Sequence, residues 1–534
     1  MKENTPENST YIIGEMPAEY AARLGNYYAS KVTNNHKKDN GQFFTPIEIA
    51  QFMASFNEVD KEKIKILDPG CGIGILSAAL VELLATSCKK LKVIELIVFE
   101  IDLSILPLAE NCFEYLRLWL NQKGIDFTFF LCKNDFVLHN SLILNNQRNS
   151  NEFYDIIISN PPYFKLPKND ERAIAAKSVI HGQTNIYSIF LLIAAKLLSQ
   201  DGQLIFITPR SFCSGSYFRL FRELFFSEVD LKAIHLFNSR KSAFKKDNVL
   251  QENIIISAGK KAHKKNLREV IVSTSMGIDD LGNRHTKKHN ISNLINFESS
   301  QKILHLPASE ADEVVIKIFR TWTGSLNKYD LEISTGPVVD FRSDDMIKLE
   351  EVKNSVPLIW LHNIEPMNFS WPKNSGYKGK QKGQYISNDK NSFSRLVKNR
   401  NYVFLRRFST KDDNRRLVAA PYFKSSLEDV PMLGIENHLN YIYHKKSELT
   451  ADETVGLAAI FNSKLFDLYF RTFNGNINVS ATELRDFPLP DFQLIQALGQ
   501  KINKNDKKRL PYLIDDLVSE TFNLSTNLSK AYGE

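Results

Sequence analysis

The strongest constraint on the fold is an alternation of short apolar runs with amphipathic runs between residues 61 and 209. The apolar runs have the length of buried strands, and the amphipathic runs have the spacing of helices. The expected strands are Ile64–Leu67, Val93–Phe99, Phe127–Cys132, Asp155–Ser159 and Leu204–Thr208, and the expected helices are Pro17–Lys31, Ile75–Leu84, Leu103–Leu120 and Ile186–Leu198. Strands that alternate with helices predict an α/β fold with a doubly wound, mostly parallel sheet.

The character of the sequence changes after about residue 260, where four lysines between residues 260 and 265 form a basic connector. From about residue 310 onward the pattern is irregular, with short strand-like runs and basic clusters. A separate mixed α/β domain is expected there, with a helical segment at Leu494–Ser529. The chain of 534 residues is therefore predicted to form two domains, 1–260 and 265–534.

Composition narrows the class of protein. Hydrophobic residues make up 43% and charged residues 24%, which is typical of a globular protein, and the net charge of +7 leans weakly toward a polyanionic partner. The five cysteines form no C-x-x-C pair, so no metal site is expected and a reducing compartment is favoured. The N-terminus lacks an apolar signal segment, and the longest apolar run is too short to span a bilayer. These features predict a cytoplasmic protein without a membrane partner.

A glycine-rich loop follows the first expected strand, at Asp68–Gly74 (Asp-Pro-Gly-Cys-Gly-Ile-Gly). Glycines let the backbone pass close beneath a ligand, and the N-terminus of the following helix offers free N–H groups. The loop therefore predicts a cofactor site, whose expected contacts are Asp68, Pro69, Gly70, Cys71 and Gly72. A dinucleotide fingerprint is the alternative, which the preceding Asp-Pro and the position of Gly74 oppose.

Acidic residues follow the next two expected strands. Glu100, with Ile101 beside it, ends the second strand, where a carboxylate can accept both ribose hydroxyls of a nucleoside. Asp135 and Phe136 follow the third strand, where the acid can accept an amino group of a base and the ring can pack on it. A solvated acid and a turn aspartate are the structural alternatives. The succession of these segments favours a cofactor that contains a nucleoside.

The most specific motif is Asn160-Pro161-Pro162-Tyr163, which closes the strand at Asp155–Ser159. Two prolines after an asparagine make a rigid, non-helical turn at the carboxyl edge of the sheet. The Asn160 side-chain oxygen and the Pro161 carbonyl are two acceptors that can bind both hydrogens of one NH2 group, and Tyr163 can stack on the ring that carries it. A buried turn is the structural alternative.

These segments and their order resemble the gamma-class N6-adenine DNA methyltransferases of bacterial restriction–modification systems, with a TaqI-type catalytic domain and a PstI-like chain overall. Further matching segments are Gly41–Pro46, Gly202–Arg210 and Phe244–Ile256. The resemblance covers about residues 35–260. It implies a Rossmann-like methyltransferase fold, S-adenosyl-methionine as the cofactor, and methyl transfer to N6 of an adenine that is flipped out of duplex DNA.

The resemblance also implies roles for further residues. Phe44, Thr45 and Pro46 correspond to the segment that holds the methionine end of the cofactor, and Phe244 corresponds to a second aromatic that stacks on the flipped adenine. Too few residues separate Phe136 from Asn160 for a recognition domain, so target recognition is expected in the C-terminal domain, as the gamma class has it.

Two basic stretches of the C-terminal domain are candidates for DNA contact. One contains Arg406, Arg407, Arg415 and Arg416, and the other contains Lys378 and Lys380. Basic residues interleaved with aromatic ones suit phosphate contacts and the reading of base edges, whereas a solvated loop face is the structural alternative. The expected partner is duplex DNA with a short specific site. A monomer is expected, with a cognate restriction endonuclease as a separate protein.

Other functions remain open at this point. An Asn-Pro-Pro-Tyr loop also suits RNA bases and planar amides, so an RNA or protein-glutamine N-methyltransferase is the alternative. A non-catalytic DNA-specificity subunit is expected to have lost the asparagine or the glycines, and both are intact here. A fused nuclease is not indicated, because the residues before the glycine loop are too few and carry no nuclease motif.

Overall fold

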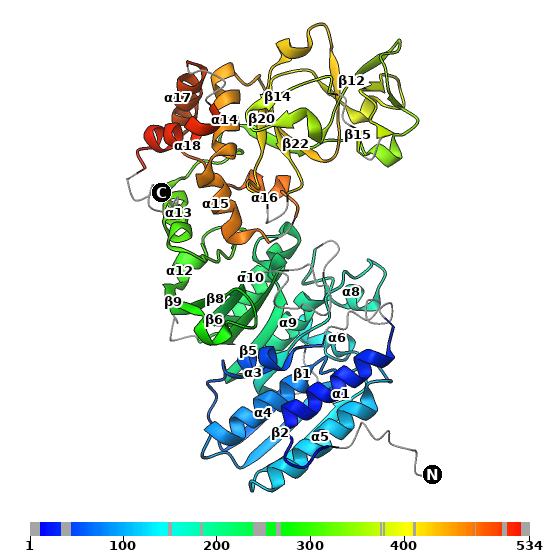
Figure 1. Cartoon of the computed structure of the whole chain (residues 1–534), viewed down its shortest axis with the longest axis vertical. Coiled ribbons are helices and arrows are strands. Elements are labelled where there is room, and N and C mark those ends of the chain that lie inside the picture. Colours follow the sequence, from blue (N-terminus) through cyan, green and yellow to red (C-terminus); the bar gives the residue numbers. More distant parts are fainter. Residues whose placement is uncertain are drawn as a thin grey trace. The chain divides into compact units, whose positions relative to one another are not determined.

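The computed structural model describes residues 11–33, 44–147, 152–181, 185–238, 252–262, 269–373, 376–377, 380–409, 413–475, 477–504 and 510–524 (Figure 1). The chain divides into two compact units, Met1–Ala308 and Ser309–Glu534. The boundary expected at 260–265 instead falls inside the first unit. The reason is that β8 and β9, at Glu269–Ser275 and His285–Asn290, continue the sheet of the first unit, with β8 paired parallel to β6.

Among the described residues, the first unit contains a nine-stranded sheet with the order β3-β2-β1-β4-β5-β7-β6-β8-β9. Its remaining strands are β1 (Lys63–Pro69), β2 (Val93–Phe99), β3 (Asp126–Cys132), β4 (Tyr154–Ser159), β5 (Leu198–Pro209), β6 (Val229–Phe237) and β7 (Asn253–Lys260). Strands β1 to β5 run parallel, and β7 lies antiparallel between β5 and β6. The predicted α/β fold with a mostly parallel sheet is confirmed. The strand order reverses between β1 and β4, which is where such sheets bind ligands.

Helices cover both faces of this sheet (Figure 1). One face packs on α1 (Pro17–Lys31), α3 (Ile47–Ala54), α4 (Ile75–Ser87) and α5 (Leu106–Asn121), and the other packs on α6 (Phe136–His139), α9 (Ile186–Leu197) and α10 (Arg219–Glu228). Successive residues of a strand enter opposite cores: Ile156 and Ile158 join the first, and Ile157 joins the second. Because both faces of the central strands are buried, β4, β5 and β7 contain continuous apolar runs, and the runs at Asp155–Ser159 and Leu204–Thr208 were recognisable in the sequence.

Two predicted elements begin several residues away from their predicted starts. The helix expected from Leu103 begins at Leu106, because Pro107 lacks an N–H and is tolerated only in the first turn. The strand expected from Leu204 begins at Leu198. Its pairing with β4 shifts in register before Gln203, so residues 201–202 lie within an irregularity of the strand.

The second unit is mixed α/β, as predicted. Its two larger sheets have the orders β10-β22-β19-β20 and β11-β17-β12-β21-β18 among the described residues. The strands are β10 (Leu331–Thr335), β11 (Ile347–Lys348), β12 (Ser355–Ile359), β13 (Ile364–Glu365), β14 (Asn368–Phe369), β15 (Gly376–Tyr377), β16 (Lys380–Gln381), β17 (Tyr385–Ser387), β18 (Leu396–Lys398), β19 (Tyr402–Arg406), β20 (Ala419–Tyr422), β21 (Met432–Ile435) and β22 (Leu439–His444). The helices are α13 (Glu310–Thr321), α14 (Ala451–Asn462), α15 (Lys464–Phe473), α16 (Ala481–Arg485), α17 (Phe492–Asn503) and α18 (Leu510–Thr521).

Close helix packing in this unit depends on glycine. A Cβ atom at Gly456 of α14 would lie 2.1 Å from the Ile495 carbonyl oxygen, and one at Gly499 of α17 would lie 1.9 Å from the Asp452 oxygen. The two helices therefore touch through their backbones. The segment expected to be helical at Leu494–Ser529 overlaps α17, which begins two residues earlier at Phe492, and contains α18. No helix in the described part of the chain is long and apolar enough to cross a membrane.

Candidate active site

The carboxyl ends of β1, β2 and β4 bring three of the predicted segments together. Pro69 is the register partner of Phe99 on β2, and the Ser159 hydroxyl of β4 donates to the Pro69 carbonyl oxygen at 2.6 Å. Gly70, Glu100 and Asn160 each follow one of these positions directly. Parallel strands place their carboxyl ends at one edge, so segments far apart in sequence meet there.

The glycine loop has a backbone that only glycine adopts easily. Gly70, Gly72 and Gly74 have φ values of 76°, 56° and 93°, in the left-handed region. The Gly70 and Cys71 N–H groups donate to the Phe99 carbonyl oxygen at 2.9 and 3.0 Å, which holds the loop against the end of β2. A Cβ atom at Gly74 would lie 2.6 Å from the Phe113 ring. The loop is therefore rigid before any ligand binds.

Asp68 carries an unused acceptor inside this loop. Its side chain is fully buried, and Oδ2 accepts the Ser77 hydroxyl hydrogen at 2.6 Å. Oδ1 has no hydrogen-bond partner among the described residues. Burial raises the pKa of the Asp68 carboxyl to about 7, the Ser77 hydrogen bond opposes this, and the Glu100 charge adds to it. Buried polar atoms are normally hydrogen-bonded, so Oδ1 fits a donor group of a bound ligand.

Asp68→Asn is expected to remove a pH dependence from the stability of the first unit. The raised folded-state pKa means that Asp68 contributes stability in full below its ordinary value of 3.8, and that this stability is lost as the pH rises through about 7. Between pH 5 and pH 8 the loss is about 3 kcal/mol in the free energy of unfolding. Thermal unfolding of the wild type and the variant at both pH values measures it, with Asp126→Asn at an exposed position as the control. Parallel pH profiles for the wild type and Asp68→Asn would contradict this account.

Glu100 is tied to the same loop. Its Oε1 accepts from the Ile101 and Asp102 N–H groups at 2.9 and 2.8 Å, and its Oε2 accepts from the Gly72 N–H at 3.0 Å. Burial raises the pKa of the Glu100 carboxyl, and these three N–H groups oppose the rise. Three of the roughly four acceptor sites of the carboxylate are thus used, and the remaining site, on Oε2, can accept from a ligand hydroxyl. Ile101 beside it is 52% exposed and offers an apolar surface for a flat ring.

Asp135 and Phe136 stabilise the structure at the carboxyl end of the sheet. Asp135 Oδ1 accepts from the Val137 and Leu138 N–H groups at 2.8 and 3.0 Å and thereby caps α6. The Phe136 ring is buried between Phe99 and Phe190, with ring centroids 5.2 and 4.9 Å away. Asp135 Oδ2 lies outside the cap and forms an ion pair with Arg172 Nη1 at 3.6 Å. In this conformation Phe136 presents no open face to a ligand, and a ligand that binds Asp135 Oδ2 shares it with Arg172.

The Asn160 turn is held by two hydroxyl groups. Asn160 Nδ2 donates to Thr45 Oγ1 at 3.0 Å, and Asn160 Oδ1 accepts from the Tyr163 hydroxyl. The Tyr163 hydroxyl also lies 2.8 Å from the Ile207 carbonyl oxygen of β5. Burial raises the pKa of the Tyr163 hydroxyl well above its ordinary value, so it stays protonated. The Tyr163 ring is buried in the core in this conformation, whereas the sequence suggested that it stacks on a substrate ring.

The Phe44–Pro46 segment joins this site. Pro46 immediately precedes α3, and the Phe44 ring packs on Tyr28 at 5.7 Å between centroids. A Cβ atom at Gly72 would lie 4.0 Å from Phe44, and one at Gly70 would lie 4.0 Å from Pro162. The two loops and the segment before α3 therefore converge. The contact between Thr45 and Asn160 has no sequence signal, because it joins residues 115 positions apart.

Three predicted site residues cannot be placed by their side chains. Phe244 and Lys378 lie outside the described residues. Lys380 belongs to β16, whose backbone pairs with β15, and its side chain is not among those described. The second stacking aromatic and the lysine contacts to DNA therefore stay predictions.

The prediction that Arg416 contacts DNA is wrong. Arg416 is fully buried, its Nε donates to Ser409 Oγ at 3.1 Å, and its Nη2 donates to Asn474 Oδ1 at 3.0 Å. Its guanidinium also lies 5.1 Å from the centroid of the Phe470 ring. A guanidinium enclosed in this way cannot reach a phosphate, so its role is structural. The spacing of basic residues in the sequence does not show whether an arginine side chain points into the core or toward solvent.

The other three predicted arginines are half-buried and bind backbone carbonyls. Arg406 Nη2 and Arg407 Nη1 donate to the carbonyl oxygens of Ile364 and Asn437, each at 2.9 Å. Arg415 Nη1 donates to the Asn462 carbonyl oxygen. A guanidinium has five N–H groups, so these contacts do not use its full donor capacity. Their contact with DNA stays a prediction.

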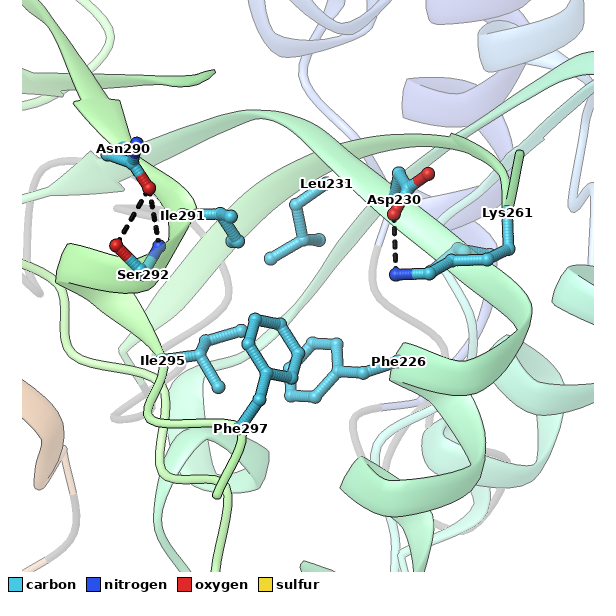
Figure 2. A pocket seen from close by; sticks show the side chains of 10 residues that line it. Phe226, Asp230, Leu231, Lys261, Asn290, Ile291, Ser292, Ile295 and Phe297 are labelled. Atoms are coloured by element: carbon cyan, nitrogen blue, oxygen red, sulfur yellow. Dashed lines mark hydrogen bonds and ion pairs between the residues drawn. The ribbon is translucent and has the colours of Figure 1, made fainter. Parts of the chain in front are cut away.

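A separate cavity of about 470 Å³ lies at the opposite edge of the sheet, where β6 begins (Figure 2). Its polar groups are paired with one another: Lys261 Nζ lies 2.6 Å from Asp230 Oδ1, and Asn290 Oδ1 accepts from the Ser292 N–H at 3.0 Å. None of the predicted site residues lines this cavity, so it does not belong to the candidate active site. Within the described ranges, no cluster of three or more His, Cys, Asp or Glu side chains is placed to hold a metal ion.

Comparison with known proteins gives the following matches. The family model of the Eco57I restriction-modification methylase matches residues 108–244. The chain is 32% identical over 479 residues to the type II methyltransferase M.BsuBI of Bacillus subtilis, covering 88% of this chain and 91% of that protein. It is 31% identical over 494 residues to the type II methyltransferase M.PstI of Providencia stuartii, covering 91% and 93%. Among solved structures, the type IIG restriction endonuclease BpuSI matches with a TM-score of 0.42 and 15% identity, over 97% of this chain and 67% of that one.

Proposed function

The chain belongs to the type II DNA methyltransferases of restriction–modification systems, and we propose that it methylates N6 of adenine at a short specific site in duplex DNA. The observation that carries this proposal is the Asn160-Pro161 turn, whose acceptors lie beside the glycine loop and Glu100 at one edge of the sheet. A primary amine on a flat ring is the group that two such acceptors fit.

S-adenosyl-methionine is the cofactor. The residues at the edge of the sheet fit it: Asp68 Oδ1 is a buried acceptor without a partner among the described residues, and Glu100 Oε2 keeps one acceptor site beside the exposed Ile101. In the proposal, Asp68, the glycines and the Phe44–Pro46 segment hold its amino-acid end, and Glu100 holds its ribose. When bound, it supplies a methyl group on a positively charged sulfur.

The chemical task of the protein is to make the amine of adenine nucleophilic. The lone pair of N6 is delocalised into the ring, so the nitrogen is a poor nucleophile while it stays planar. In the proposed mechanism, Asn160 Oδ1 and the Pro161 carbonyl oxygen accept its two hydrogens and favour a tetrahedral nitrogen with a localised lone pair. Holding that lone pair in line with the methyl group supplies much of the rate, so no strong base is needed before transfer. The methylated nitrogen is positively charged and acidic, so it loses its extra proton to water afterwards.

Duplex DNA presents a geometric problem, because N6 of a paired adenine lies inside the helix. Enzymes that modify a base therefore flip it out into a pocket, at a cost of a few kcal/mol for unstacking and unpairing. We assign cofactor binding and catalysis to the first unit, and recognition of the DNA sequence to the second. A monomer that acts beside a separate endonuclease is the simplest arrangement consistent with this division.

The proposal is tested by tritium transfer from S-adenosyl-methionine to bulk bacterial DNA, followed by nucleoside analysis. The expected product is N6-methyladenine in duplex DNA. N4-methylcytosine would contradict the choice of adenine, because that base also carries an exocyclic amine. Label in RNA or in protein glutamine, with none in DNA, would overturn the proposed substrate.

A further inference from the structure

The side-chain amide of Asn160 can face the substrate in two ways. Its oxygen accepts hydrogen bonds and its nitrogen donates them, and the two ends have nearly the same shape. An amine substrate needs the oxygen to face it. An amide nitrogen turned toward an NH2 group would place one hydrogen-bond donor against another. The proposed reaction therefore requires that one of the two orientations be selected.

Thr45 is placed to make this selection. Its Oγ1 lies 3.0 Å from Asn160 Nδ2 and accepts one of the amide hydrogens. The Thr45 side chain is 7% exposed and directly precedes Pro46, the residue before α3. A β-branched side chain has few accessible rotamers, and α3 packs against α4 and β5, so the position of this hydroxyl is well defined.

The other end of the amide has its own anchor. Asn160 Oδ1 accepts from the Tyr163 hydroxyl, whose oxygen also lies 2.8 Å from the Ile207 carbonyl on β5. In the proposed reaction the same oxygen accepts a hydrogen of the amine, and a carbonyl oxygen has two lone pairs with which to accept. Thr45 and Tyr163 thus hold opposite ends of one amide, and the Tyr163 anchor does not depend on Thr45.

We propose that Thr45 is a positioning residue that selects the reactive orientation of the Asn160 amide by accepting a hydrogen from its nitrogen. This inference rests on the proposed amine substrate and adds a role to a residue that the family resemblance links only to the cofactor. A threonine hydroxyl has one hydrogen and two lone pairs. Accepting from Asn160 therefore leaves its own hydrogen free for a second partner, and the role toward the cofactor is not displaced.

The test replaces Thr45 by valine, which keeps the shape and removes the hydroxyl. We expect Thr45→Val to lower kcat about tenfold at saturating cofactor and DNA, which corresponds to the loss of one hydrogen bond in the reactive state. Thr45→Ser keeps the hydroxyl and is expected to retain kcat within about threefold. Thr86→Val, at an exposed position on α4, is the matched control and is expected to leave kcat unchanged.

Two further measurements separate this role from cofactor binding and from folding. Calorimetric titration gives the affinity of each variant for S-adenosyl-methionine, and thermal unfolding gives its stability. A full recovery of the Thr45→Val rate at high cofactor concentration would overturn the proposal, because the defect would then lie in KM. Equal losses in the valine and serine variants, or an unchanged kcat in the valine variant, would overturn it as well. Failure of the proposed function is distinguishable, since the wild type would then put no label into adenine.

Discussion

Replacing Asn160 with alanine is expected to lower methyl transfer by about a hundredfold to a thousandfold while cofactor binding survives. The substitution removes Oδ1, one of the two acceptors proposed to bind the amine of adenine. The residues proposed to hold the cofactor keep their own partners: Ser77 binds Asp68, and the Gly72 N–H binds Glu100. Initial rates of tritium transfer measure the first effect, and calorimetric titration with S-adenosyl-methionine measures the second.

Asn121→Ala, at the exposed end of α5, makes the same chemical change away from the site and serves as the control. Wild-type turnover in Asn160→Ala would contradict the proposed mechanism, because it would show that this amide is dispensable. A parallel loss of cofactor affinity would instead show that the amide acts through the shape of the cofactor site.

The second large effect concerns stability. Arg416→Leu is expected to destabilise the second unit by about 3–5 kcal/mol, because it removes a guanidinium that donates to several buried acceptors. The acceptors are Ser409 Oγ and both oxygens of Asn474, the farthest at 3.3 Å from the guanidinium. Hydrogen exchange of amides in Ser309–Glu534 measures the loss, and it avoids treating two units as one two-state transition.

Arg407→Leu is the matched comparison. Arg407 is half-buried and donates one hydrogen bond to the Asn437 carbonyl oxygen, so its removal is expected to cost about 1 kcal/mol. If Arg407 also contacts a DNA phosphate, its loss lowers DNA affinity and the salt dependence of binding. A stable, fully folded Arg416→Leu protein with weakened DNA binding would refute the structural role given to Arg416.

The predicted effect of Asp68 on stability and the predicted effect of Thr45 on activity concern neighbouring parts of the candidate active site. The Asp68 carboxyl is buried, which raises its pKa, and its Oδ1 has no hydrogen-bond partner among the described residues. The buried Oδ1 therefore lowers the stability of the free protein, and a bound cofactor that donates a hydrogen bond to it can restore this stability. Binding sites often hold such strain, because the groups that fit the ligand cannot also satisfy one another.

The sequence by itself determined the elements and loops whose character depends on neighbouring residues. The strand at Val93–Phe99 and the helix at Pro17–Lys31 have the predicted bounds, because apolar spacing and a proline in the first turn are local signals. The glycine loop and the Asn160 turn were also recognisable, since positive φ values and prolines restrict the backbone wherever they occur. The α/β class followed from the order of these elements.

Only the tertiary structure decided which side chains meet and which are buried. The unit boundary lies near residue 308, because the pairing of β8 with β6 joins strands that the basic connector separates in sequence. Arg416 turns inward onto Asn474, and Thr45 meets Asn160 across 115 positions. Composition and spacing describe a residue and its neighbours in the chain, whereas these contacts depend on which strands pair and on which face of the sheet a segment crosses.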